Sequence, residues 1–219
     1  MHSTLSIPRH DTPDPMGLGD DDTALRRLIR DAERAVVTRG ERSEARARRL
    51  ERFISRLSTG GLSDELTHLA KSRAFWWLAT RLIGDAAAHH APALFFSFDV
   101  DCLREVNERF GRPAGDALLC RASNVLRLVF RHPGRHLVWR VGGDEFAAVT
   151  LDAGLDSEEF QLRRLSQLLL RDNVTAGPPQ LALGVGIARI EPNARRSLRD
   201  IVREADARMR EDKRIRRQE

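Results

Sequence analysis

From residue 66 onward the chain alternates between two patterns of apolar residues, one helical and one strand-like. Apolar residues three and four positions apart predict helices over 66–88, 105–110, 116–130, 157–170 and 197–210. Short continuous apolar runs predict strands over 93–100, 137–141, 146–151 and 181–190. This mixed order predicts an α+β fold in which helices cover one face of a largely antiparallel sheet.

The N-terminal part of the chain has a different pattern. Residues 1–22 are rich in Pro, Gly and Asp without any period, which is typical of a disordered leader. Residues 23–60 carry a helical apolar stripe that weakens around Gly40, so one long helix and two shorter helices both remain open. An apolar stripe of this kind is stable when it packs against another apolar surface. That surface is either the chain's own domain or, as we favour, a second chain in a coiled coil. We therefore predict a helical arm at 23–60 for dimerisation or partner binding, followed by a domain at 61–219.

Two glycines and two carboxylates interrupt the predicted strands in the segment VWRVGGDEFAAVT at 138–150. A tight hairpin explains Gly142 and Gly143, because glycine tolerates the positive φ of such turns. It does not explain Glu145, which stands where the next strand should turn inward. A bare glycine backbone also lets a phosphate or a base approach closely.

A second acidic position, Asp99, ends the apolar strand FSFDVD. If the two strands are neighbours, Asp99 and Glu145 would share a cation, and their hard oxygen ligands suit magnesium. The alternative for Asp99 is an ordinary turn or helix cap at the strand end. Together the two sites favour metal-assisted phosphoryl chemistry.

Composition narrows the class of protein further. Of 219 residues, 41% are hydrophobic and 32% charged, which suits a soluble protein, and no window is apolar enough to span a membrane. The N-terminus lacks a secretory signal, and Cys102 and Cys120 form no CxxC pair, so we expect a cytoplasmic location. The net charge is +5 and only Lys71 and Lys213 are lysines. The many arginines suit a phosphate-bearing partner, but ordinary solvated faces explain them better, and a nucleic-acid partner is disfavoured.

Three segments carry a family resemblance. GGDEF at 142–146 resembles the signature of the GGDEF-domain family, the bacterial diguanylate cyclases. DVDCLREVNERFGRPAGD at 99–116 resembles the family's upstream block, and READARMREDKRIRR keeps Ala205, Asp206, Lys213 and Arg217 in step with its C-terminal motif. The resemblance covers about 64–217. It implies a palm-like nucleotidyl-cyclase fold, with a mostly antiparallel sheet flanked by helices and a helical stalk in front.

The resemblance also implies a reaction, in which two GTP molecules condense to cyclic di-GMP and two pyrophosphates across a homodimer. Asp99, Glu145 and the backbone carbonyl of Val100 would hold magnesium ions, with manganese as an alternative. Asp144 would deprotonate or position the attacking 3′-hydroxyl. Arg104 would lie beside the phosphates.

The same resemblance implies which residues bind the nucleotide. Asn107 and Asp116 would bind the guanine edge. Gly142 and Gly143 would lie against the nucleotide. The phosphates would be bound by backbone N–H groups near Leu103 and by Lys213 and Arg217.

Some positions depart from the family pattern. The entry motif D-x-L-T-G-L-x-N-R appears as DELTHLAKS at 64–72, with His68 in place of glycine and Lys71 in place of asparagine. The inhibitory Arg-x-x-Asp site is missing from 133–136, so we expect no product inhibition through that site. The family usually places a sensory domain in front, where only a short helical arm is expected here, so we expect a separate regulatory protein that binds the arm. The altered motif leaves one alternative open, a degenerate domain that binds GTP or cyclic di-GMP as a receptor or scaffold.

Overall fold

The computed structural model describes residues 63–71, 79–80, 83, 92–132, 136–151, 157–192 and 196–216. The expected leader at 1–22 and helical arm at 23–60 lie outside these residues. Within the described residues, no helix is both long and apolar enough to cross a membrane.

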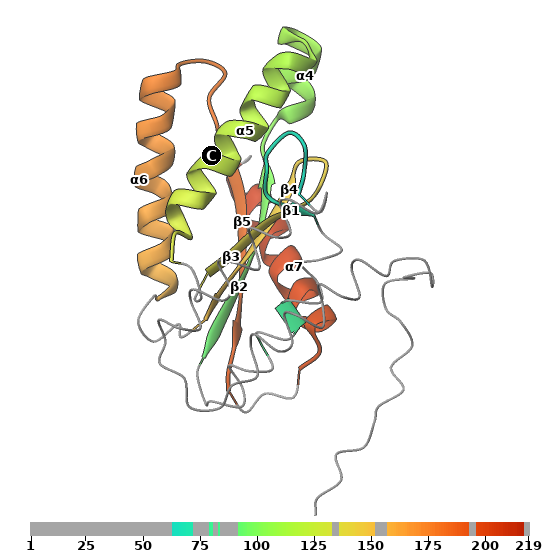
Figure 1. The fold of residues 1–219 in the computed structure, drawn as a ribbon, viewed down its shortest axis with the longest axis vertical. Coiled ribbons are helices and arrows are strands. Elements are labelled where there is room, and N and C mark those ends of the chain that lie inside the picture. Colours follow the sequence, from blue (N-terminus) through green and yellow to red (C-terminus); the bar gives the residue numbers. More distant parts are fainter. Residues whose placement is uncertain are drawn as a thin grey trace, which may run out of the picture.

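A five-stranded sheet forms the centre of the molecule (Figure 1). Its spatial order is β1 (Ala70–Lys71), β3 (His136–Gly142), β4 (Glu145–Leu151), β2 (Ala93–Val100) and β5 (Leu183–Ile190). Only β1 and β3 pair in parallel; the other neighbours are antiparallel. The largely antiparallel sheet expected from the sequence is therefore confirmed.

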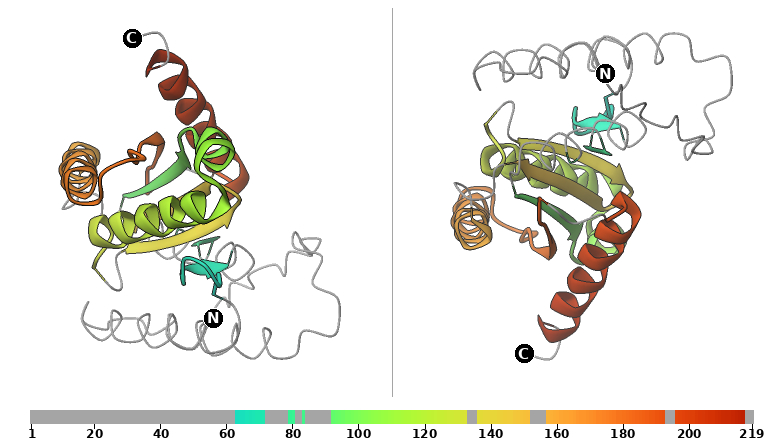
Figure 2. Two further views of the ribbon diagram at one scale, coloured as in Figure 1. Left: turned by 90° about the horizontal axis from the view of Figure 1, so that it is seen from above. Right: turned by 90° about the horizontal axis from the view of Figure 1, so that it is seen from below.

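Helices cover both faces of this sheet (Figures 1 and 2). One face packs against α5 (Arg112–Val129) and α6 (Glu158–Ala176), and the other against α7 (Leu198–Arg216), while α4 (Leu103–Phe110) precedes α5. The expectation that helices cover only one face is wrong. Successive residues of β2 point to opposite faces, and both Phe95 and Phe96 are buried, so each face needs its own apolar cover.

Two glycines of β5 allow α7 to approach the sheet closely. A Cβ atom at Gly186 would lie 1.9 Å from the carbonyl oxygen of Ala205 and 2.5 Å from the backbone nitrogen of Met209. A Cβ atom at Gly184 would lie 2.6 Å from Cε of Lys213. The bare strand surface thus sets the distance between β5 and α7, and it lets the Lys213 side chain cross the strand toward β2.

The start of the domain is not the helix that the sequence predicted. Residues 65–67 form a turn, Ser63 bridges to Ala70, and β1 pairs with β3, whereas Ala79, Thr80 and Ile83 are helical as expected. His68 has a φ of 54°, in the left-handed region that the family's glycine would occupy without strain. Leu66, Leu69 and Ala70 have helical spacing, but side chains of α5 bind the carbonyls of this loop and hold it in a compact turn.

Among the other predicted elements, β2 has the predicted ends and the rest exist with at least one end shifted. α5 begins four residues earlier than predicted, and α6 and α7 each extend six residues further. Ser157 caps α6 as expected, since its hydroxyl accepts a hydrogen bond from the Phe160 backbone N–H.

Candidate active site

Asp99 and Glu145 lie directly opposite each other in the antiparallel pair of β2 and β4. Opposed residues of such a pair project from the same face of the sheet, and here that face is the one covered by α7. Their adjacency is what the sequence analysis expected if the two strands were neighbours. Asp144 lies close to them, because its backbone carbonyl accepts a 3.0 Å hydrogen bond from Val100 N. We call Asp99, Asp144 and Glu145, with the neighbouring Asp101, the acidic corner.

Burial and mutual repulsion act on both carboxylates. The pKa of Asp99 is raised by partial burial and by the charges of Asp144 and Asp101, which together exceed the attraction of Lys213. The pKa of Glu145 is raised by partial burial and by the charges of Asp206, Asp99 and Asp144. A cation placed between the two carboxylates would relieve this repulsion.

The donor set suits a hard divalent cation. Magnesium commonly takes one or two protein carboxylates and completes its shell with water and substrate phosphates. Asp99 and Glu145 supply the carboxylates, and the carbonyl of Val100 follows Asp99 directly in the chain. Among the described residues, no three histidine, cysteine, aspartate or glutamate side chains converge as a metal cluster.

Lysine and arginine side chains from α7 neutralise the acidic corner. The Lys213 ammonium donates to Asp99 and also lies 3.0 Å from Asp101. Burial lowers the pKa of Lys213, but the hydrogen bonds that its ammonium donates to the two aspartates outweigh burial and leave that pKa raised. Arg216 binds Asp101 at 2.8 Å and Asp212 at 2.9 Å. The predicted phosphate ligand Lys213 is therefore at the site, while Arg217 lies outside the described residues.

The turn between β3 and β4 presents a bare backbone. Gly142 and Gly143 are exposed, and a Cβ atom built on either would have no heavy atom within 4 Å. Gly143 has a φ of 52°, which glycine adopts without strain. The open space beside the two residues leaves room for a flat or charged ligand group.

Residues expected to bind guanine meet where α4 and α5 join. A Cβ atom at Gly115 would lie 2.0 Å from Oδ1 of Asn107, so the Asn107 amide rests directly on the backbone that precedes Asp116. Gly111 makes the connection with a φ of 83°, and its N–H donates to the Asn107 carbonyl. The structure thus places Asn107 against Gly115, the residue that precedes Asp116 in the chain.

The α4 N-terminus follows Asp101 closely. Asp101 N donates to the Ala182 carbonyl, and Leu103 is the first residue of the helix. Arg104 is exposed and pairs with Glu108 at 2.9 Å, so its side chain lies on the outer surface of α4. This ion pair holds Arg104 away from Asp99 and Glu145, whereas the predicted phosphate ligand Lys213 contacts Asp99.

Three further residues, Arg140, Asp206 and Arg216, contact the site but were not predicted to take part in the reaction. Arg216 binds Asp101, and Asp206 accepts a 2.6 Å hydrogen bond from the Ser97 hydroxyl beside Glu145. Asp206 and Lys213 are seven residues apart, about two helical turns, so the α7 period was the available signal for Asp206. Arg140 contacts the Gly143 carbonyl, and no local pattern pointed to it.

The family model and the curated relatives that match this chain name the same family. Residues 62–219 match the family model described as "Diguanylate cyclase, GGDEF domain". Diguanylate cyclase DgcN from Escherichia coli strain K12 is 34% identical over 114 residues, which cover 52% of this chain and 27% of DgcN. The match to probable diguanylate cyclase DgcE from the same strain covers 10% of that protein. The chain therefore spans a minor part of the length of these relatives.

Solved structures share the fold. The GGDEF domain of TpbB, also called YfiN, from Pseudomonas aeruginosa is 28% identical, with a TM-score of 0.58 over 69% of this chain and 88% of that chain. Diguanylate cyclase SiaD from Pseudomonas aeruginosa, solved in complex with its activator SiaC, is 22% identical, with a TM-score of 0.64 over 87% of this chain and 70% of that chain. The expected fold class, a mostly antiparallel sheet flanked by helices, is confirmed by these neighbours.

Proposed function

The chain belongs to the GGDEF diguanylate cyclase family, and from that premise we propose that it condenses two GTP molecules into cyclic di-GMP and two pyrophosphates. The observation that carries the proposal is the register of β2 and β4, which sets Asp99 opposite Glu145 beside the open turn at Gly142 and Gly143. In the reaction, the 3′ oxygen of each GTP bonds to the α-phosphorus of the other as the bond to pyrophosphate breaks.

Asp99, Glu145 and the Val100 carbonyl would hold magnesium or manganese ions. The bound ion supplies positive charge that stabilises the phosphoryl transition state and activates the hydroxyl. Lys213 donates a hydrogen bond to Asp99, next to the position proposed for the phosphates. Its positive charge would therefore stabilise the negative charge of the bound phosphates. Arg217, four positions after Lys213 in the sequence, would also bind the phosphates, and Arg104 would do so once its ion pair with Glu108 breaks.

The remaining residues would position the nucleotide. Asn107, which packs against Gly115, and the next residue, Asp116, would offer an amide and a carboxylate that match the ring N–H and exocyclic amine of guanine. Gly142 and Gly143 leave space for the nucleotide, with the N–H groups at Leu103 near its phosphates. Asp144 would hold or deprotonate the 3′-hydroxyl. Fixed placement of both reactants then contributes much of the rate.

The product joins two nucleotides, so two domains must face each other, and we propose a homodimer. The apolar stripe at 23–60 supports a role for the arm in forming or controlling that dimer. SiaD, which shares the fold, was solved with its activator, and this supports a regulatory protein as the input to the arm. Deletion of residues 1–58 should lower both dimer content and activity; an unchanged dimer with unchanged activity would contradict this role.

The activity itself is tested by product analysis. The purified full chain is incubated with GTP and Mg²⁺, and the nucleotides are separated and identified by mass. We expect cyclic di-GMP and pyrophosphate in a 1:2 ratio, and no cyclic dinucleotide from ATP. Bound GTP without turnover at concentrations where dimers form would instead favour the receptor alternative.

A further inference from the structure

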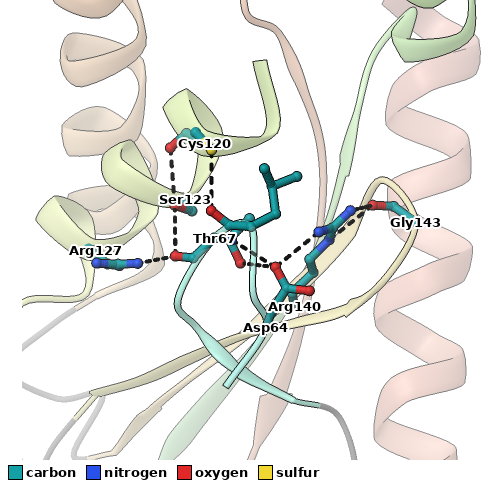
Figure 3. A network of polar contacts seen from close by, with 8 residues as sticks. Asp64, Thr67, Cys120, Ser123, Arg127, Arg140 and Gly143 are labelled. Carbon is teal, nitrogen blue, oxygen red and sulfur yellow. Dashed lines mark hydrogen bonds and ion pairs between the residues drawn. The ribbon is translucent and has the colours of Figure 1, made fainter. Parts of the chain in front are cut away.

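The Arg140 side chain connects two segments that are far apart in the sequence (Figure 3). Its Nη1 atom lies 3.0 Å from Oδ1 of Asp64, in the loop where the described part of the domain begins. Its Nε and Nη2 atoms donate to the carbonyl of Gly143 at 3.1 and 2.6 Å. The Arg140 side chain is only 13% exposed and that of Asp64 24%, so solvent screens this ion pair less than a surface pair.

The entry loop, residues 64–67, is itself held firmly. Oδ1 of Asp64 accepts hydrogen bonds from the backbone N–H and the hydroxyl of Thr67, at 2.8 and 2.7 Å. Helix α5 binds the carbonyls of this loop through three side chains (Figure 3). These are Cys120, which donates to Leu66, and Ser123 and Arg127, which donate to Thr67. Arg140 therefore has a fixed anchor at its Asp64 end.

The turn at the other end has little packing of its own. Gly142 and Gly143 carry no side chains, and the space around them is open. The Gly143 carbonyl belongs to the peptide plane that joins Gly143 to Asp144. The orientation of that plane sets the direction in which Asp144, and after it Glu145, leaves the turn. Two guanidinium N–H groups on one carbonyl fix this plane more tightly than a single bond would.

We propose that Arg140 is a positioning residue that ties the glycine turn to the entry loop, so that the entry loop sets the geometry of the two acidic residues. The proposal rests on the proposed function for its kinetic consequences. Asp64 stands near the start of the domain, which the family model matches from residue 62, so a change imposed there would reach the turn through Asp64 and Arg140. This contact gives the domain a direct route from its N-terminal segment to its reactive turn.

A matched control is available within the fold. Arg121 pairs with Asp172 at 2.8 Å, with side chains 17% and 21% exposed, and also donates to the Pro179 carbonyl at 2.7 Å. This pair joins α5 to the end of α6, away from the turn. Arg140→Met and Arg121→Met should lower Tm by similar amounts. We expect kcat to fall at least ten-fold in Arg140→Met and less than two-fold in Arg121→Met.

Arg140→Lys and Asp64→Asn complete the kinetic test. Lysine keeps a charge near Asp64 but loses the two-point contact with Gly143, so Tm should recover while kcat stays low. If Asp64 and Arg140 act as one unit, the double variant Asp64→Asn/Arg140→Met should lose no more kcat than Arg140→Met alone. If the fold-losses in kcat of the two single variants multiply in the double variant, Asp64 and Arg140 act independently, which would contradict the proposed coupling.

Hydrogen exchange gives a readout that does not need turnover. In the nucleotide-free protein, Arg140→Met should speed exchange of the amides at 143–145 at least ten-fold, and Arg121→Met should leave them unchanged. A wild type that makes no cyclic di-GMP would overturn the proposed function, while the exchange rates would still decide whether Arg140 holds the turn. Unchanged exchange, or faster exchange with unchanged kcat in an active enzyme, would overturn the inference.

Discussion

Partial burial and the repulsion of neighbouring carboxylates raise the pKa values of Asp99 and Glu145, so the fold disfavours their ionised forms. A carboxyl group whose pKa is higher in the folded protein than in the unfolded chain destabilises the fold once it is ionised. Stability therefore falls as pH rises through the raised pKa. This is the pattern expected where function requires charges that the fold alone would not favour.

Glu145→Gln in metal-free protein tests this directly. The neutral amide removes the repulsion, so Tm at pH 7 should rise by roughly 1–2 °C, an effect kept small because Glu145 is exposed and water screens it. The gain should disappear below the 4.5 of an unperturbed glutamate, where the wild-type side chain is neutral in both states. Thermal melts from pH 4 to 8 measure it. Glu105→Gln, in the first turn of α4, should give no such gain.

Gly115→Ala tests the contact of Asn107, one of the two residues proposed to bind guanine. In a helix, alanine normally stabilises by about 1 kcal/mol relative to glycine. Here the new methyl group would lie 2.0 Å from Oδ1 of Asn107 and force that amide away. KM for GTP should rise about ten-fold, the equivalent of one lost hydrogen bond, with kcat little changed. Asn124→Ala, on the exposed side of α5, should leave KM within two-fold; equal effects of the two would contradict the role of Asn107.

The residues of the site differ in how far the sequence could predict them. Asp99 and Glu145 stood out because each ends or begins an apolar strand, but their opposition depends on a register that no local pattern fixes. The Arg140 contact with Asp64 spans 76 positions, and the sequence contains many other arginines. Such long-range ion pairs have no local signature, so only the folded structure reveals them.

At the level of elements, strong periodicity predicted the type of structure well and the ends poorly. The strands on either side of Gly142 and Gly143 were found because their apolar runs are continuous. The segment 66–71 was misassigned because its apolar spacing also fits a helix, and tertiary contacts with α5 and β3 decided the outcome. The end of α7 was missed because its last turns are charged; there Lys213 and Arg216 bind Asp99 and Asp101 rather than an apolar core.

The contact between β5 and α7 predicts different results for two neighbouring glycines. Gly186→Ala places a methyl group against the α7 backbone, which cannot move aside, so the free energy of unfolding should fall by about 2–4 kcal/mol. Gly184→Ala meets only the flexible Lys213 side chain, so the loss should stay below about 1 kcal/mol. Displaced Lys213 should nevertheless slow cyclic di-GMP synthesis. Urea denaturation and initial rates measure both effects; equal stabilities of the two variants would contradict the packing.

At the level of the whole molecule, the proposed chemistry needs two copies, because each domain is expected to hold one GTP. The rate per mole of protein at saturating GTP should therefore fall as the protein is diluted below the dimer dissociation constant. Initial rates over a hundred-fold dilution, with sedimentation at the same concentrations, measure this. A specific rate that stays constant while the protein becomes monomeric would rule out synthesis across a dimer.

The central claim is that Asp99 and Glu145 together hold the ion that GTP condensation requires. The most direct measurement is the yield of cyclic di-GMP from GTP and Mg²⁺ with the wild type and Glu145→Ala side by side, together with Mn²⁺ binding to each protein by electron paramagnetic resonance. The account predicts product and bound Mn²⁺ for the wild type, and for the variant weaker Mn²⁺ binding and a rate at least a thousand-fold lower, about 4 kcal/mol in barrier height. A folded Glu145→Ala variant that binds Mn²⁺ and makes cyclic di-GMP as the wild type does would contradict it.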